Sequence, residues 1–165
     1  KLCSTAAVLV GVWADLVTAV ESKRLSFKKE IDARASMIVV DPTKLHDVLR
    51  NLLENAVNYA PECSVIRFES FLEDKNIVMR ISDSGPGIPE TDLPRIFERF
   101  YRVDRARTRD PGGTGLGLAI VKHLVGLHGG TVCAANRPEG GAIFTISLPK
   151  VGDQDLRAAV TKSVR

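Results

Sequence analysis

The sequence predicts an α/β sandwich in which helices cover one face of a β-sheet. Segments with helical spacing and segments with strand character follow one another in blocks, which is typical of a helix layer packed on a sheet layer. At 165 residues the chain has the length of one domain with a single core. Its composition, 44% hydrophobic and 26% charged, is that of an ordinary soluble protein.

Each expected element has a local signal. Helical spacing, and helix start and stop residues, predict helices at residues 5–21, 42–60 and 115–128, with a short helical piece near 93–100. Strand character predicts strands at residues 25–31, 37–40, 65–72, 76–83, 131–135 and 142–148. The second helix is the best marked, because Asp41 suits its N-cap, Pro42 suits its first position and Pro61 prevents its continuation.

Charge, cysteine spacing and the length of apolar runs give no sign of nucleic-acid binding, a cysteine metal site or a membrane span. The net charge of +3 gives no reason to expect a nucleic acid or a membrane surface as partner. The three cysteines are dispersed without metal-ligand spacing, which fits packing residues in a reducing cytoplasm. No apolar run approaches the roughly 20 residues of a membrane span.

The helix at residues 42–60 has an unusual polar face. Asn51, Glu54, Asn55 and Asn58 fall within an arc of roughly 100°, opposite an apolar stripe. A solvated surface is the plain interpretation of such an arc. Asparagine, however, is a poor helix former, because its amide competes for backbone hydrogen bonds. Three asparagines on one face therefore indicate a need for neutral amides at fixed positions, such as contacts with a hydrated Mg²⁺ and phosphates.

A carboxylate follows the strand at residues 76–83. Asp83 has the parity of the apolar Ile77, Met79 and Ile81, so it points toward the core, where a carboxylate is costly unless hydrogen-bonded. Gly85 and Gly87 come directly after it and let the backbone turn tightly or approach a ligand closely. A turn capped by an aspartate and a ligand site fit this motif equally well.

A third motif, the glycine-rich residues 112–118, runs straight into a helix. Glycines at a helix N-terminus expose N–H groups where phosphates bind. The loop lacks the Lys-Ser or Lys-Thr of a P-loop, and a charged segment rather than a strand precedes it, which argues against a dinucleotide fingerprint. Alone this loop is a weak signal, but its order and spacing with the other two motifs make a strong one.

In four ordered motifs the chain resembles the catalytic ATP-binding domain of sensor histidine kinases. Residues 51–59 resemble the N box, 83–88 the G1 box, 96–102 the F box and 113–118 the G2 box. The resemblance covers about residues 15–149 and implies a Bergerat fold, shared with gyrase, Hsp90 and MutL: a two-layer sandwich with a mixed β-sheet and helices on one face. Residues 1–14 are then expected to be a linker and 150–165 a tail.

The resemblance also implies ATP and Mg²⁺ as cofactors and a role for each motif residue. Asp83 accepts a hydrogen bond from the adenine amino group, and Thr145 supports that contact directly or through water. Asn55 is the metal ligand, and Glu54 helps to position it or the nucleophile. The predicted nucleotide-binding residues are Asn51, Asn55, Asn58, Tyr59, Asp83, Gly85, Gly87, Ile88, Tyr101, Arg102, Gly113, Thr114, Gly115, Leu116, Gly117, Leu118 and Thr145; Glu54 and Arg102 are the predicted catalytic residues.

One position departs from the family pattern. Asn58 stands where many relatives carry lysine, which affects its expected phosphate contact.

Residues 99–114 are expected to form the ATP lid. Their five arginines are interspersed with Asp104 and Asp110, which favours phosphate contacts and lid docking over a nucleic-acid patch. Arg102 matches an arginine that reaches the terminal phosphate.

A phosphoacceptor histidine is missing. None of the three histidines, His46, His123 and His128, has the acidic residue, arginine and proline expected after an acceptor, and packing or surface roles suit them better. The acceptor is expected on a dimerisation hairpin upstream of Lys1, with a response regulator downstream and a monomeric isolated domain. The implied function is transfer of the γ-phosphoryl group of Mg-ATP to that histidine. The expected location is the cytoplasm, in a parent that is free or anchored in the inner membrane.

Two alternatives stay open. One is an ATPase clamp of the gyrase, Hsp90 and MutL type, and the other is a non-catalytic nucleotide-binding module. The Phe-Tyr-Arg of the F box, residues 100–102, and the compact size favour the kinase.

Overall fold

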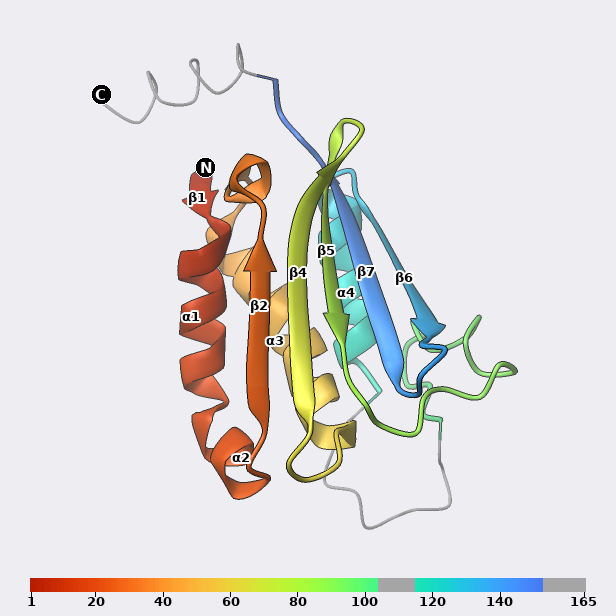
Figure 1. The fold of residues 1–165 in the computed structure, drawn as a ribbon. Helices are drawn as coiled ribbons and strands as arrows, with labels where there is room; N and C mark the ends of the chain where they lie inside the picture. Colours follow the sequence, from red (N-terminus) through yellow and green to blue (C-terminus); the bar gives the residue numbers. More distant parts are fainter. Residues whose placement is uncertain (104–114, 153–165) are drawn as a thin grey trace.

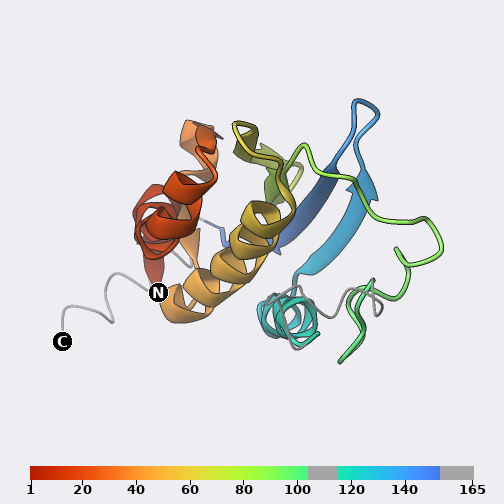
Figure 2. The same ribbon diagram turned by 90° about the horizontal axis from the view of Figure 1, so that it is seen from below.

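The computed structural model describes residues 1–103 and 115–152, and it has two layers (Figures 1 and 2). The helices are α1 (Thr5–Asp15), α2 (Val17–Ser22), the 3-10 turn η1 (Ala33–Ala35), α3 (Pro42–Tyr59) and α4 (Gly117–Leu127). The strands are β1 (Leu2–Ser4), β2 (Ser26–Ile31), β3 (Met37–Val39), β4 (Val65–Glu73), β5 (Asn76–Ser82), β6 (Thr131–Asn136) and β7 (Ala142–Pro149).

The main sheet has five strands in the order β2-β4-β5-β7-β6, with α1, α3 and α4 on one face (Figure 1). Strands β2 and β4 are parallel and the other neighbours are antiparallel, so the sheet is mixed. The predicted fold class, a two-layer sandwich with helices on one face of a mixed sheet, is therefore confirmed.

The core lies between these two layers. On β4, β5 and β7 alternate side chains, including Phe68, Met79 and Phe144, are buried against the leucines of α3 and against Val121 of α4. This alternation follows from the period of two in a strand. It places Asp83, one residue beyond β5, on the helix-covered side of the sheet.

Helix α3 forms where the sequence predicts it. The Asp41 carboxylate accepts hydrogen bonds from the N–H groups of Thr43 and Lys44, as an N-cap should, and Pro42 occupies the first turn. The helix ends at Tyr59, before Ala60 and Pro61. One face of α3 enters the core, with Leu49, Leu52 and Leu53 fully buried, and the opposite face carries the asparagines.

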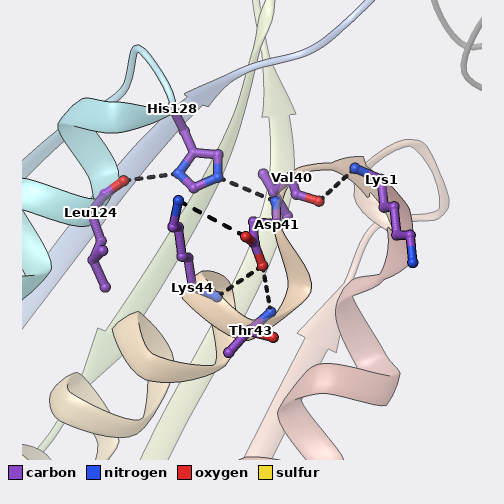
Figure 3. Close-up of polar contacts among 7 residues, drawn as sticks. All are labelled: Lys1, Val40, Asp41, Thr43, Lys44, Leu124 and His128. Atoms are coloured by element: carbon purple, nitrogen blue, oxygen red, sulfur yellow. Dashed lines mark hydrogen bonds and ion pairs between the residues drawn. The ribbon is translucent and has the colours of Figure 1, made fainter.

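The end of α4 is joined to the start of α3 by His128 (Figure 3). Its Nε2 accepts a hydrogen bond from the backbone N–H of Asp41 at 3.2 Å, and its Nδ1 lies 2.8 Å from the carbonyl oxygen of Leu124. These contacts require a neutral ring whose proton is on Nδ1. The side chain of Lys44 pairs with Asp41 at 3.9 Å beside the ring. His128 thus has the packing role expected for it.

Residues 1–14 differ from the expected linker. Strand β1 pairs with β3 in a separate two-stranded sheet, with Leu2 opposite Val39, so residues 37–40 do not join the main sheet. Helix α1 packs on α3 and buries Leu9 and Val12 completely. The segment is part of the folded domain, because these apolar side chains complete its core. The helix predicted at residues 5–21 is also divided, since α1 ends at Asp15 and α2 begins at Val17.

The short helix expected near residues 93–100 is absent from the structure as described. Successive turns occupy this segment, linked by bonds such as Arg95 N–H to the Asp92 carbonyl and Glu98 N–H to the Arg95 carbonyl. These bonds span three residues, whereas the ladder of an α-helix joins residues four apart. Among the described residues, no helix has the length and apolarity that crossing a bilayer requires.

Candidate nucleotide-binding site

Asp83 is the most constrained polar residue of the site. Its side chain is only 3% exposed, and its Oδ1 accepts hydrogen bonds from the N–H of Gly85 at 2.8 Å and of Ala142 at 3.4 Å. Burial raises the pKa of Asp83, against the lowering effect of these two bonds and of the nearby Arg137. Oδ2 makes no hydrogen bond to any described residue, so this oxygen is left as an acceptor for a ligand.

Two glycines permit the tight packing around Asp83. A Cβ at Gly85 would lie 2.6 Å from the Tyr59 carbonyl oxygen and 2.9 Å from Asp83 Oδ1. Gly141 has a φ of +95°, and a Cβ there would lie 1.9 Å from the Asp83 carbonyl oxygen. The turn after β5 therefore lies in close contact with the end of α3 on one side and with the β6–β7 hairpin on the other. Gly141 is a site residue that the sequence analysis missed.

The next part of this turn is held by Asn136, at the end of β6. Its side-chain amide makes two hydrogen bonds of 2.7 Å with the backbone of Ile88, accepting from the N–H and donating to the carbonyl. Gly87, with a φ of +76°, approaches so closely that a Cβ would lie 2.7 Å from Asn136 Oδ1. The amide therefore fixes the position of residues 87 and 88, a role the sequence analysis did not assign.

Arg137 holds the other side of the turn. Its Nη1 donates to the Asp83 carbonyl oxygen at 2.8 Å and its Nη2 to Glu139 at 2.8 Å. The arginine side chain is only 15% exposed, although it belongs to a hairpin turn. Arg137 was not predicted as a site residue, because an Arg-Pro-Glu-Gly-Gly stretch has the composition of an ordinary solvated turn.

The asparagine face of α3 meets the start of α4. Asn51 donates to the Asp47 carbonyl at 2.8 Å, and a Cβ at Gly117 would lie 2.9 Å from Asn51 Oδ1. Asn55 is half-buried one turn further along α3, whereas Glu54 and Asn58 are exposed. The structure thus brings Asn51 to the glycine-rich helix start and directs Glu54 and Asn58 toward solvent.

The C-terminal end of α3 is completed by two further residues. Lys23 donates from Nζ to the carbonyls of Val57 and Asn58, at 2.8 and 3.0 Å, which satisfies the last turn of the helix. Tyr59 is 48% exposed, and its carbonyl lies against Gly85. The end of the N box therefore contacts the turn after β5 directly, through the Tyr59 carbonyl and Gly85.

The F box meets the start of the glycine-rich helix through its backbone. Phe100 N–H donates to the Gly115 carbonyl at 2.9 Å, and a Cβ at Gly115, whose φ is +71°, would lie 2.7 Å from the Phe100 carbonyl carbon. Tyr101 donates its hydroxyl to Asp92, and Arg95 lies 4.6 Å from the centre of its ring. Arg102 follows as an exposed residue.

Leu116 precedes helix α4, which begins at Gly117, and Leu118 packs against the core. The predicted site residues Gly113 and Thr114, and residues 104–114 of the predicted lid, lie outside the described residues.

The structure separates Thr145 from Asp83. In the β5–β7 ladder Thr145 lies opposite Arg80, whereas the backbone of Asp83 pairs with Ala142. Three residues along a strand is about 10 Å and an opposite face of the sheet. Thr145 therefore does not support the Asp83 contact. Ala142, whose N–H reaches Asp83 Oδ1, occupies the position nearest that carboxylate on β7.

Solved structures with this arrangement include those of histidine kinases. The catalytic domain of the histidine kinase ThkA superposes with a TM-score of 0.79 and 26% identity, covering 91% of this chain and 95% of that one. The mycobacterial sensor histidine kinase MprB gives a TM-score of 0.77 and 27% identity, over 91% of this chain and 97% of that one. The fold is thus that of a histidine kinase ATP-binding domain.

The family model described as "Histidine kinase-, DNA gyrase B-, and HSP90-like ATPase" matches residues 40–152, and the chain belongs to this family. Similar proteins include sensor histidine kinase WalK of Bacillus subtilis, 38% identical over 137 residues, and the signal transduction histidine-protein kinase AfsQ2 of Streptomyces coelicolor, 39% identical over 146 residues. These alignments cover 82% and 88% of this chain but only 22% and 25% of the relatives, so the chain spans about a quarter of their length.

Proposed function

We propose that this domain binds Mg-ATP and transfers the γ-phosphoryl group to a histidine on a separate dimerisation domain, in two-component signalling. The single observation that carries the proposal is Asp83, a buried carboxylate with one oxygen fixed by backbone N–H groups and the other without a partner among the described residues. Such an acceptor suits the amino group of adenine, and the glycine-rich start of α4 suits the phosphates.

At the phosphate end, the described residues fit a magnesium ion. Mg²⁺ keeps several waters and takes few protein ligands besides phosphate oxygens, so one neutral amide suffices. Asn55 is half-buried one helical turn from Asn51, which itself touches the start of α4. We assign Asn55 as the metal ligand, with Asn51 beside it. When bound, the ion would neutralise charge on the phosphates.

We base the remaining assignments on the resemblance of the four motifs to those of histidine kinases. Phosphoryl transfer needs mainly positioning and charge neutralisation. Arg102, exposed at the end of the F box, is assigned to the terminal phosphate, and Glu54 to the positioning of Asn55 or of the incoming nucleophile. Asn58 is assigned a phosphate contact, and Tyr59 and Tyr101 line the nucleotide.

The relatives favour a kinase over the other members of the family. Relatives named as histidine kinases include the sensor-like histidine kinase SenX3 of Mycobacterium tuberculosis, 43% identical over 119 residues. We infer a response regulator as the downstream partner and the cytoplasm, where ATP is available, as the location of this domain.

Calorimetry of the wild-type domain and of Asp83→Asn tests the adenine assignment. Wild type is expected to bind ATP with micromolar to millimolar affinity, and the amide, which presents a donor to the amino group, is expected to weaken binding at least tenfold. The matched control is Asp32→Asn, which alters a half-buried carboxylate beyond the opposite end of β2. Unchanged affinity in Asp83→Asn would remove the basis of the proposal.

The phosphate end is tested separately with Asn55→Ala. Loss of the amide oxygen is expected to abolish most of the gain in affinity that Mg²⁺ gives, while ADP binding in the presence of EDTA stays close to wild type. If Mg²⁺ strengthens binding as much in Asn55→Ala as in wild type, the ion lies elsewhere.

A further inference from the structure

Arg137 is a nearly buried charged group in a place where the sequence predicts only a solvated turn. It lies directly after β6, and the hairpin is closed by two backbone bonds, Arg137 N–H to the Gly141 carbonyl at 2.9 Å and Gly140 N–H to the Arg137 carbonyl at 3.1 Å. Its guanidinium does not extend into solvent. It turns back to the Asp83 carbonyl at 2.8 Å, and Glu139 holds its other nitrogen.

The contact of Arg137 is with the backbone of the residue that we assign to adenine. Ala142 makes two hydrogen bonds with Asp83: its N–H donates to the Asp83 side chain, and its carbonyl accepts from the Asp83 N–H. Gly141 packs so closely against the Asp83 carbonyl that there is no room for a Cβ. Arg137 thus contributes the one side-chain hydrogen bond to Asp83 among the described residues. A guanidinium is a planar, permanently charged donor, which suits a fixed contact of this kind.

We propose that Arg137 is a positioning residue for nucleotide recognition: by holding the Asp83 carbonyl it fixes the carboxylate in the orientation in which Oδ2 receives the base. This inference rests on the proposed function. It adds a residue that contacts Asp83, the residue assigned to adenine, and does not contact the nucleotide itself. Glu139 orients the guanidinium from the solvent side, since its own side chain is 64% exposed.

Electrostatics gives the proposal a signature that a merely structural contact would lack. Burial raises the pKa of Asp83, the hydrogen bonds from the Gly85 and Ala142 N–H groups lower it, and the charge of Arg137 adds a smaller lowering effect. An adenine amino group requires the ionised carboxylate, so binding weakens as the pH falls through the pKa of Asp83. Removing Arg137 raises that pKa further, and the pH at which binding is lost must therefore move upward.

The test is nucleotide binding by Arg137→Gln, measured by calorimetry with ADP across roughly pH 5 to 8, in the presence of EDTA so that Mg²⁺-dependent contacts do not contribute. We expect the dissociation constant at neutral pH to rise about tenfold, and the pH midpoint for loss of binding to lie above that of wild type. Arg137→Lys keeps the charge without the planar fork and should retain a midpoint near wild type.

The matched control is Arg34→Gln, which removes an arginine from another local pair with a carboxylate, Asp32, beyond the opposite end of the sheet. It should change neither the affinity nor the midpoint. Far-UV circular dichroism establishes that each variant is folded. If Arg137→Gln does not fold, the folded Arg137→Lys and Glu139→Gln variants carry the test, and both should weaken binding measurably.

The outcomes separate this inference from the proposed function. If Asp83→Asn loses binding while folded Arg137→Gln keeps the wild-type affinity and pH midpoint, Arg137 is not a positioning residue and the adenine assignment stands. If Arg137→Gln weakens binding without moving the midpoint, the contact is only structural and the inference is also overturned. If wild type does not bind ATP, the proposed function itself fails.

Discussion

The backbone packs so closely around Asp83 that few residue types fit at the neighbouring positions. Gly141 has a φ of +95°, which L side chains rarely adopt, and it lies against the Asp83 carbonyl. The same carbonyl receives Arg137, and the carboxylate of the same residue receives two N–H groups. One residue is thus fixed through its main chain and its side chain at once, which is the preorganisation that a recognition group needs.

Gly141→Ala should therefore damage both stability and binding. The added methyl group must displace the Asp83 backbone, and we expect a loss of about 1–3 kcal/mol of unfolding free energy together with weaker ATP binding. The matched control is Gly126→Ala in α4, where nothing lies within 4 Å of the new Cβ. That variant should gain about 0.5–1 kcal/mol, because alanine is the better helix former. Urea unfolding and calorimetry measure both, and a wild-type affinity in folded Gly141→Ala would contradict this account.

At the scale of elements, the site is assembled from the ends of helices and strands that are distant in sequence. Helix α3 supplies the asparagines, the turn after β5 supplies Asp83, and the start of α4 supplies the phosphate end. Their relative positions depend on how α3 and α4 pack. His128 joins the end of α4 to the N-cap of α3, at the far end of α4 from the glycine-rich loop (Figure 3).

His128→Ala should loosen this junction. It leaves the Asp41 N–H without its acceptor, at an expected cost of about 1–2 kcal/mol in unfolding free energy. The control is His123→Ala, on the exposed side of the same helix, which should change stability by less than about 0.5 kcal/mol. Thermal unfolding of both variants checks this, and equal melting temperatures would show that the bond from His128 contributes nothing.

At the scale of the whole molecule, the positions of the histidines decide what the isolated chain can do. His46 on α3 pairs with Asp15 at 3.1 Å, and His128 is held between two helices. His123 lies on α4 and lacks the sequence context of an acceptor. Under the proposed function, the acceptor histidine belongs to another domain.

The isolated chain is accordingly expected not to phosphorylate itself on histidine. Incubation with radiolabelled Mg-ATP should yield no acid-labile phosphate, because none of these three histidines has the sequence context of an acceptor. Adding the dimerisation domain of the parent protein should give a labelled histidine on that domain. Phosphohistidine at position 46, 123 or 128, identified by mass spectrometry, would refute the assignment of separate catalytic and acceptor domains.

The sequence by itself determined the features that depend on neighbouring residues. Helix α3 was predictable because Asp41, Pro42 and Pro61 act within a turn of their own positions. The inward direction of Asp83 was predictable because side chains alternate along a strand, and its burial agrees with the parity of β5. The two-layer class followed from the same periodicities.

Only the tertiary structure decided which distant segments meet. Arg137 contacts Asp83 across 54 positions and Asn136 contacts Ile88 across 48, and no local pattern encodes either pairing. Thr145 was misassigned because strand register, rather than residue type, sets which face and which neighbour it has. Residues 1–14 likewise became part of the core through packing on α3. Local propensity acts within a few residues, whereas these contacts form only once the sheet and the helices have closed on one another.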